Sequence, residues 1–183
     1  DNVTVVQGDC LKLDLAALIR ERFCAMPVSV CANLPYYITS PIVMRLLESR
    51  LPVTNITVMV QKEAAERLCA APGTRAAGAV TLAVNYYAEA EVLFSVSRGS
   101  FLPAPNVDSA VVRIDIDRHK LDGENEALLH KLARSSFAMR RKTLANNLSV
   151  AFSLGKQEAT QIVEEAGFQP LVRGEALSLD DYK

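Results

Sequence analysis

The sequence predicts an α/β fold in which a largely parallel sheet is followed by a small all-helical segment. Up to about residue 117, short apolar runs of strand type alternate with segments of helical periodicity, which is the order of strand-helix-strand units. After a polar stretch, only helical periodicity follows. We therefore expect one domain over residues 1–118 that contains the sheet, and a helical subdomain over residues 119–183.

The elements follow in order from these patterns. The apolar runs at 3–6 and 28–32 are the first two predicted strands, and the near-continuous apolar character of the second is typical of a strand buried on both faces. Gly167 stands where a helix would have its C-terminal cap, and Ser178 opens a capping-box pattern that predicts the start of one more helix. The other predicted strands are 56–60, 92–96 and 110–114, and the predicted helices are 15–23, 39–47, 62–70, 79–87, 126–137, 143–152 and 156–166.

Composition excludes several classes of protein. Among 183 residues, 20 lysines and arginines stand against 21 acidic residues, and the net charge is −1. A globally basic nucleic-acid binder is therefore excluded, although a local basic patch is not. No apolar run approaches the roughly 18 residues that a membrane helix needs, so we expect no membrane partner.

The cysteines do not form a metal site. There are four, at Cys10, Cys24, Cys31 and Cys69, and none is spaced as C-x-x-C. Only two histidines are present, and neither lies near a serine or cysteine motif typical of a hydrolase triad. We expect small buried thiols in a reducing cytoplasm and no metal.

The charge is unevenly distributed. Between residues 127 and 157 there are six basic side chains and no acidic one. The interleaved Asn146 and Asn147 would suit phosphate contact, whereas the bland interpretation is a solvated helix face. The basic residues are Lys131, Arg134, Arg140, Arg141, Lys142 and Lys156.

The sharpest motif is Asn33-Leu34-Pro35-Tyr36, at the end of the second predicted strand. Ligands of open α/β sheets bind beyond the carboxyl ends of strands. The Asn33 side chain and the Leu34 carbonyl could accept hydrogen bonds from an amine and so aim its lone pair, while Pro35 stiffens the backbone and Tyr36 offers a face for stacking a base. The alternative is a plain strand-to-helix turn.

Two weaker signals accompany it. Gly8-Asp9-Cys10 follows the first predicted strand, and there the Asp9 carboxylate and the Cys10 amide could contact an adenine ring, although Gly-Asp is a common turn. In the loop at 100–109, two prolines could present Phe101 rigidly as the second face of a base sandwich. A phenylalanine that packs in the core beneath a loop is the competing interpretation.

Together these motifs resemble the ribosomal RNA adenine N6-dimethyltransferase family, enzymes that modify adjacent adenosines of small-subunit rRNA. The resemblance spans nearly the whole chain. Methylases of large-subunit rRNA share part of the pattern, but the segments at 107–112 and 140–148 resemble the small-subunit enzymes more. The matching segments are GDC at 8–10, NLPYYITSPIV at 33–43, FLPAPNVDSAVVRI at 101–114, SSFAMRRKTLANNL at 135–148 and RGEALSL at 173–179.

The resemblance implies a class I methyltransferase sheet of Rossmann type with a helical C-terminal subdomain, and S-adenosyl-L-methionine as the methyl donor. It implies that Asp9, Cys10 and Asn33 bind the cofactor. It also implies that Asn33, Leu34 and Pro35 receive the target N6, with the flipped adenine held between Tyr36 and Phe101. By the same resemblance Arg134, Arg140, Arg141 and Lys142 face rRNA phosphates.

Further expectations come from the family. The partner would be small-subunit rRNA in a pre-ribosomal 30S-type particle, and the intact enzyme a cytoplasmic monomer. The family carries a glycine-rich loop after its first strand and an acidic residue after its second, and neither occurs in this sequence. We therefore expect a fragment truncated at both ends, whose strand at 3–6 is an orphan edge and which binds the cofactor weakly or not at all by itself.

Two other functions are compatible with the sequence. The chain could be an rRNA-binding or ribosome-assembly module without catalysis, which would use only its basic helices. It could also methylate amino groups of DNA, since such enzymes carry a similar Asn/Asp-Pro-Pro-Tyr motif. Leu34 in place of proline and the segment at 140–148 count against DNA.

Overall fold

The computed structural model describes residues 2–24, 26–49, 51–117 and 126–182. Its centre is a four-stranded sheet of order β1-β2-β4-β3. The strands are β1 (Val28–Asn33), β2 (Val53–Gln61), β3 (Ala88–Val96) and β4 (Ser109–Ile116). The helices are α1 (Leu15–Phe23), α2 (Thr39–Glu48), α3 (Lys62–Leu68), α4 (Ala79–Tyr87), α5 (Glu126–Ser136), α6 (Leu144–Phe152) and α7 (Lys156–Glu165).

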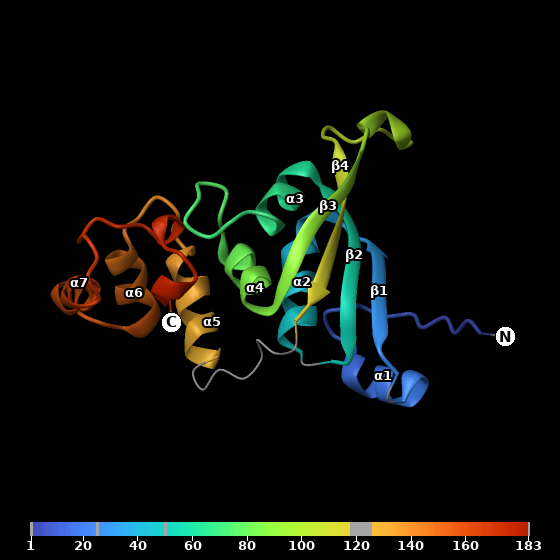
Figure 1. Cartoon of the computed structure of the whole chain (residues 1–183), viewed down its shortest axis with the longest axis horizontal. Helices are drawn as coiled ribbons and strands as arrows, with labels where there is room; N and C mark the ends of the chain where they lie inside the picture. Colours follow the sequence, from blue (N-terminus) through green and yellow to red (C-terminus); the bar gives the residue numbers. More distant parts are fainter. Residues whose placement is uncertain (1, 25, 50, 118–125, 183) are drawn as a thin grey trace.

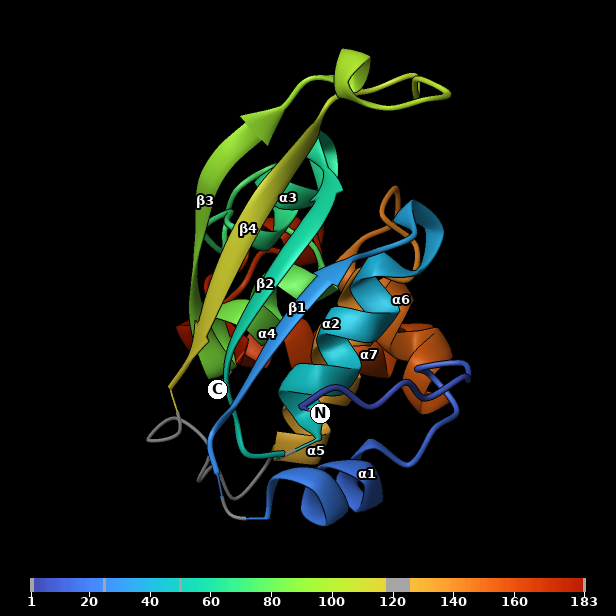
Figure 2. The same ribbon diagram turned by 90° about the vertical axis from the view of Figure 1, so that its right-hand side faces the viewer.

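Helices α2, α3 and α4 cover one face of the sheet, and α5, α6 and α7 lie beyond them on the same side (Figure 1). Figure 2 shows the other face, over which no helix of the described chain passes. Residues of β2 alternate between buried and half-buried, because successive side chains of a strand point to opposite faces. Ile56, Val58 and Val60 are the buried set, at 1% exposure or less, and they face the helical layer.

Helix α2 is amphipathic, and its buried residues include Ile42, Val43, Leu46 and Leu47. Their spacing places them on one side of the helix, where they join the same core cluster as the buried residues of β2 and β4. This packing fixes the start of α2 directly beyond the end of β1. It therefore positions the Asn33–Tyr36 motif that connects the two.

The prediction of a largely parallel sheet is wrong for the described strands. Only β1 and β2 pair in parallel, whereas β4 is antiparallel to both β2 and β3. The cause lies in the connections. A parallel pair needs a crossover, usually a helix, and the proline-rich segment between β3 and β4 contains no long helix, so these strands form a hairpin. The α/β class itself is confirmed.

Two local expectations near the N-terminus also fail. Residues 3–6 form no strand, and Val3 and Val5 are 74% and 89% exposed, because no strand of the described chain lies beside them. Strand β1 is not buried on both faces: it is the edge of the sheet, and its residues alternate between exposed and less exposed positions.

The thiols are free, as expected, but none is fully buried. Cys24 and Cys31 are exposed, and Cys10 and Cys69 are half-buried. Cys31 is exposed because it lies on the open face of the edge strand β1. Burial and the nearby Glu91 carboxylate raise the pKa of the Cys69 thiol.

A second hydrophobic cluster lies among α5, α6 and α7, with Leu82 of α4 as a member. Gly167 follows α7 with a φ of +86°, as expected of a cap. Ser178 and Asp181 form the predicted reciprocal capping bonds at 2.7 and 3.2 Å, but the element that they cap is a single 3₁₀ turn, Asp180–Tyr182. The predicted domain boundary at residue 118 lies outside the described residues, so the division stays a prediction.

None of the described helices has both the length and the apolar character that crossing a membrane requires.

Candidate active site

The Asn33–Tyr36 motif leaves the carboxyl end of β1 and turns into α2. Leu34 is buried, at 7% exposure, and its amide donates to the Met59 carbonyl of β2 at 3.2 Å. Pro35 then begins the 3₁₀ turn Tyr36–Ile38. The apolar Leu34 anchors the motif, while Asn33 and Pro35 on either side of it stay exposed.

The second wall of the site is the loop at 97–108, which joins β3 to β4. The Asp108 carboxylate accepts a hydrogen bond from the Arg98 amide at 2.9 Å, which closes the base of the loop. The Asp108 carbonyl accepts from the Lys62 amide at 3.0 Å, which ties the loop to the start of α3. The ends of β1 and β2 and this loop lie at the same end of the sheet (Figure 2).

A cavity of about 350 Å³ lies where these two segments meet. That volume is within the range of small-molecule pockets. It brings together all five residues predicted to receive the target base, although they come from segments more than 60 positions apart. The lining residues are Asn33, Leu34, Pro35, Tyr36, Phe101, Pro103 and Pro105.

The polar side chains of this cavity differ in whether they are hydrogen-bonded within the chain. The Asn33 side chain makes no hydrogen bond within the described chain, so it remains available to a ligand. The Tyr36 hydroxyl, by contrast, lies 2.8 Å from the Ser109 Oγ. Neither Tyr36 nor Phe101 stacks on another aromatic side chain of the described residues. An exposed amide oxygen beside two unstacked rings suits a planar ligand that carries an amine.

Asp9 and Cys10 do not line this cavity. They lie in the turn before α1, where the Asp9 carboxylate accepts from the Leu11 amide at 2.9 Å and lies 3.7 Å from the Lys12 amine. The Cys10 carbonyl accepts from the Arg45 guanidinium of α2 at 2.7 Å. The Asp9 side chain is 47% exposed. The structure therefore does not bring Asp9 and Cys10 together with Asn33 in one pocket, and their role stays a prediction.

The predicted RNA-binding residues differ in how free they are. Arg134 is paired with Glu48 of α2 through two contacts of 2.5 Å. Arg140 donates to the Arg75 carbonyl at 3.3 Å and lies 3.9 Å from the Glu175 carboxylate. Arg141 and Lys142 are exposed in the turn between α5 and α6. The last two are thus the best placed to meet a phosphate.

Asn147 is not a phosphate contact, because it is buried at 1% exposure. Its Oδ1 accepts from the Met139 amide at 2.9 Å, and its Nδ2 lies 3.2 to 3.3 Å from the carbonyl oxygens of Ser136, Met139 and Thr143. Asn147 therefore organises the turn that carries Arg141 and Lys142. Its place inside the buried pattern of α6, beside Leu144 and Leu148, was the one sequence signal for this role.

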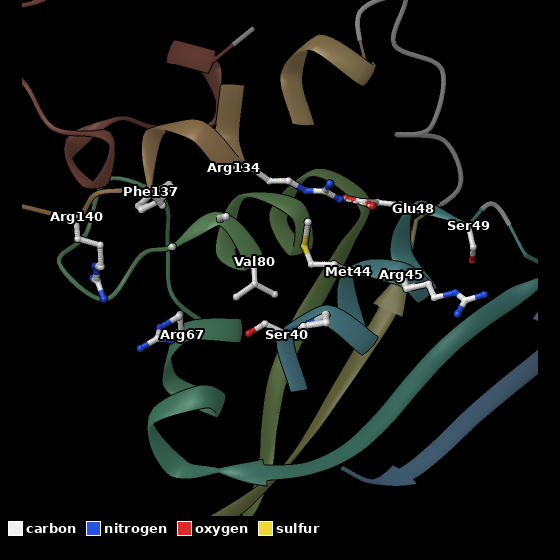
Figure 3. A pocket seen from close by; sticks show the side chains of 13 residues that line it. Ser40, Met44, Arg45, Glu48, Ser49, Arg67, Val80, Arg134, Phe137 and Arg140 are labelled. Atoms are coloured by element: carbon white, nitrogen blue, oxygen red, sulfur yellow. Dashed lines mark hydrogen bonds and ion pairs between the residues drawn. The ribbon is translucent and has the colours of Figure 1, made fainter. Parts of the chain in front are cut away.

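A larger cavity of about 730 Å³ separates the helices that cover the sheet from α5. Arg67 and Arg140 lie together at one side of it, while Arg134 turns to Glu48 at the other (Figure 3). Sequence reasoning did not identify this groove, because its lining comes from four separate segments. The lining residues are Ser40, Pro41, Met44, Arg45, Glu48, Ser49, Arg67, Gly78, Ala79, Val80, Arg134, Phe137 and Arg140.

A cluster of titratable groups connects α4 to α5 beside this groove. The Tyr87 hydroxyl donates to Glu126 at 2.5 Å and also contacts the His130 ring, while His130 lies 3.7 Å from Glu48. Burial and the hydrogen bond to Glu126 raise the pKa of Tyr87 far above its usual range. Among the described residues, no group of histidine, cysteine and acidic side chains could hold a metal ion.

Comparison with known proteins identifies the family. A family model described as "Ribosomal RNA adenine dimethylase" matches residues 1–182. The chain is 46% identical over 185 residues to a ribosomal RNA small subunit methyltransferase A of Lachnoclostridium phytofermentans. It is 45% identical over 183 residues to the protein of that name from Clostridioides difficile. All of this chain is covered in both comparisons, but it spans only 64% and 63% of the length of these relatives.

A solved structure shares the fold. It is that of a dimethyladenosine transferase from Plasmodium falciparum, with a TM-score of 0.70 and 24% identity over 97% of this chain and 68% of that one. The predicted methyltransferase fold is thus confirmed. With the motifs of the cavity in place and the family match extending over nearly every residue, the chain belongs to the ribosomal RNA adenine dimethylase family.

Proposed function

We propose that the protein containing this chain transfers methyl groups from S-adenosylmethionine to the N6 atoms of adjacent adenosines in small-subunit rRNA. The observation that carries the proposal is the cavity in which Asn33, Leu34, Pro35, Tyr36 and Phe101 meet, in a chain of this family. We propose further that the substrate is the rRNA of a pre-ribosomal 30S-type particle, and that the enzyme acts as a monomer in the cytoplasm.

Asn33 and the Leu34 carbonyl are the proposed acceptors for the N6 amine. An aryl amine is a weak nucleophile because its lone pair is shared with the ring. Two acceptors that hold its two protons would turn the lone pair towards the incoming carbon. The unpartnered, exposed Asn33 side chain supports this role, and Pro35 stiffens the backbone between the two acceptors and Tyr36.

Tyr36 and Phe101 are the proposed stacking partners of an adenine that has left its helix. Each base–aromatic stack contributes about 1–3 kcal/mol, which would offset much of the cost of unstacking the base. Because two methyl groups are added, the cavity must also accept a monomethylated amine. No carboxylate base is needed in the cavity, because the amine can release its proton after transfer.

The cofactor S-adenosylmethionine would supply a methyl group already activated on a sulfonium. Asn33 at the end of β1 and the half-exposed Asp9 carboxylate can each accept a hydrogen bond from an amine, and we assign them to the cofactor as two separate contacts, because they do not line one cavity. Asp9 would have to exchange its contact with Lys12 for the ligand. This exchange is inexpensive, because exposed ion pairs contribute only about 0–1 kcal/mol.

RNA binding is assigned to the basic turn between α5 and α6. Arg141 and Lys142 are exposed there, and Arg140 stands at the rim of the larger groove. Arg134 would contact RNA only by giving up its pair with Glu48. Phosphate contacts of this kind position the RNA but do not select its sequence.

A labelled-methyl assay tests the substrate. The full-length protein is incubated with labelled S-adenosylmethionine and, in separate reactions, unmodified small subunits, large subunits and duplex DNA. We expect label only in the small-subunit rRNA, as N6,N6-dimethyladenosine. Binding to small subunits without any transfer would instead favour the assembly module, and label in the large subunit or in DNA would favour the other methylase classes.

A further inference from the structure

One hydrogen bond ties the phenol of Tyr36 to the sheet. The Tyr36 hydroxyl lies 2.8 Å from the Ser109 Oγ, and Ser109 is completely buried, at 0% exposure. We propose that Ser109 is a positioning residue: its hydroxyl fixes the plane in which the Tyr36 ring stacks on the target adenine. This role rests on the adenine pocket proposed above.

Ser109 is a fixed point of the framework. It is the first residue of β4, and it pairs with Gln61 of β2 on one side and with Val96 of β3 on the other. Backbone pairing on both sides holds its Cα in place, and complete burial keeps water away from its hydroxyl.

Tyr36 has less support of its own. It lies in a single 3₁₀ turn, whose backbone hydrogen bond runs from the Ile38 amide to the Pro35 carbonyl at 3.1 Å, and its side chain is half-buried. Pro35 restrains the backbone that precedes Tyr36, and the hydrogen bond to Ser109 restrains the hydroxyl. The ring is thus held at both ends. Its orientation is therefore set before a base arrives, which lowers the entropy lost on stacking.

The same strand start also holds the other aromatic residue of the pocket. Ser109 directly follows Asp108, whose carboxylate closes the base of the loop that carries Phe101. Tyr36 and the loop that carries Phe101 are thus both anchored at the start of β4, although they come from different segments. This shared anchor would keep the spacing between the two rings suited to one base, and a loss of about 1 Å in position can lower a rate by about 100-fold.

The test compares Ser109→Ala, Tyr36→Phe and the double variant in the full-length protein. Ser135→Ala is the control, because Ser135 is also a buried serine whose hydroxyl donates to a carbonyl, that of Lys131. Three quantities are measured: the kcat of methyl transfer, the KM for S-adenosylmethionine, and the fluorescence of 2-aminopurine placed at the target position of the RNA. Stacking on Tyr36 quenches that fluorescence.

We expect each single variant to lower kcat about threefold to tenfold, the effect of one net hydrogen bond, and to weaken the quenching, with an unchanged KM for the cofactor. The double variant should lose no more than either single one, since both remove the same bond. Losses that multiply in the double variant, or a Ser109→Ala protein as active and as quenched as wild type, would overturn the positioning role.

The outcomes separate this role from the proposed function. A wild-type protein that transfers no methyl group contradicts the function itself, whereas normal wild-type transfer with an unaffected Ser109→Ala contradicts only the role of Ser109. If Ser109→Ala does not fold, Tyr36→Phe decides, because it removes the hydrogen bond and keeps the serine. Unchanged quenching in Tyr36→Phe then counts against the proposal.

Discussion

At the scale of single residues, Asn147 shows how one buried side-chain amide can organise a turn. It lies under the segment at 136–143 and is bonded to that segment's backbone at both the amide oxygen and the amide nitrogen. The segment carries Arg140, Arg141 and Lys142. The sequence suggested that Asn147 contacts phosphate. In the structure its side chain instead supports, from the interior, the turn whose exposed cations would make that contact.

Replacing Asn147 by alanine should destabilise the fold and loosen this turn. The change removes the side-chain partner of the Met139 amide and of the Ser136 carbonyl, whereas the Met139 and Thr143 carbonyls keep backbone donors. A buried group left unsatisfied costs about 1–3 kcal/mol. We expect the free energy of unfolding in urea to fall by about 2 kcal/mol or more. The matched control is Asn146→Ala, which removes chiefly a contact of 2.8 Å with the Thr143 hydroxyl, and an equal loss there would contradict the assigned role.

The residues of the proposed adenine pocket line one cavity, and most of them could be grouped from the sequence. Four of them form the contiguous motif Asn33–Tyr36, so their chemistry can be recognised without knowing the fold. Ser109 could not be assigned in this way. It contacts Tyr36 across 73 positions of sequence, and only the pairing of β4 in the sheet brings its hydroxyl to the phenol.

At the scale of elements, α4 and α5 are joined by the Tyr87 hydroxyl. Tyr87 closes α4 at 0% exposure, stacks on His130 of α5 with ring centroids 5.2 Å apart, and donates to Glu126 at 2.5 Å. A buried hydrogen bond to a carboxylate contributes about 1.5–3 kcal/mol. This contact is therefore a main link between the helical layer on the sheet and the helices beyond it.

The same contact predicts a loss of stability at alkaline pH. Tyr87 has a raised pKa in the folded state, and burial raises the pKa of Tyr182 to about 12. Above pH 10 the unfolded chain gives up these protons while the folded chain keeps them, so the free energy of unfolding falls as pH rises. The contribution is fully present below about pH 10 and declines over the window from there to the folded pKa values.

Urea denaturation at several pH values checks this expectation. Tyr87→Phe should be less stable than wild type at neutral pH, because it loses the bond to Glu126. Its stability should fall less steeply between pH 10 and 12, because one of the two shifted groups is gone. A Tyr87→Phe variant with the same pH slope as wild type would show that Tyr87 does not govern alkaline unfolding.

Elements were easier to predict than their pairing. The bounds of α4 and the presence of β1 to β4 follow from local apolar patterns. The antiparallel placement of β4 does not, because it depends on which strands meet in space. The loop at 97–108 did indicate a hairpin, because it is too rich in proline to form a crossover helix. The alternation of predicted strands and helices along the chain nevertheless favoured a parallel sheet.

At the scale of the whole molecule, near-neutral charge conceals an uneven distribution. The net charge is −1, yet the turn between α5 and α6 exposes Arg141 and Lys142 side by side. Charge totals are visible in the sequence, but which cations remain free is not. Only the folded chain shows that Arg134 is engaged with Glu48, so the proposed RNA-binding surface is narrower than the basic stretch.

Arg141→Ala should weaken RNA binding uniformly across sequences. Removing one phosphate contact should lower the slope of log K against log salt by about 1, while pocket geometry and the transfer rate at saturating RNA stay the same. Filter binding to small subunits at several salt concentrations measures the slope. The control is Arg22→Ala on α1, an exposed arginine beside Glu21, and a slope change of the same size there would contradict the assignment.

The central claim is that Asn33 orients the N6 amine of an adenosine in small-subunit rRNA. The most direct measurement is the yield of N6,N6-dimethyladenosine in digested rRNA after small subunits react with the full-length wild-type protein or with Asn33→Ala. We expect the variant to bind small subunits as wild type does and to lose transfer by about 100-fold, the effect of misaligning a reacting group. Undiminished dimethyladenosine from Asn33→Ala would contradict the account.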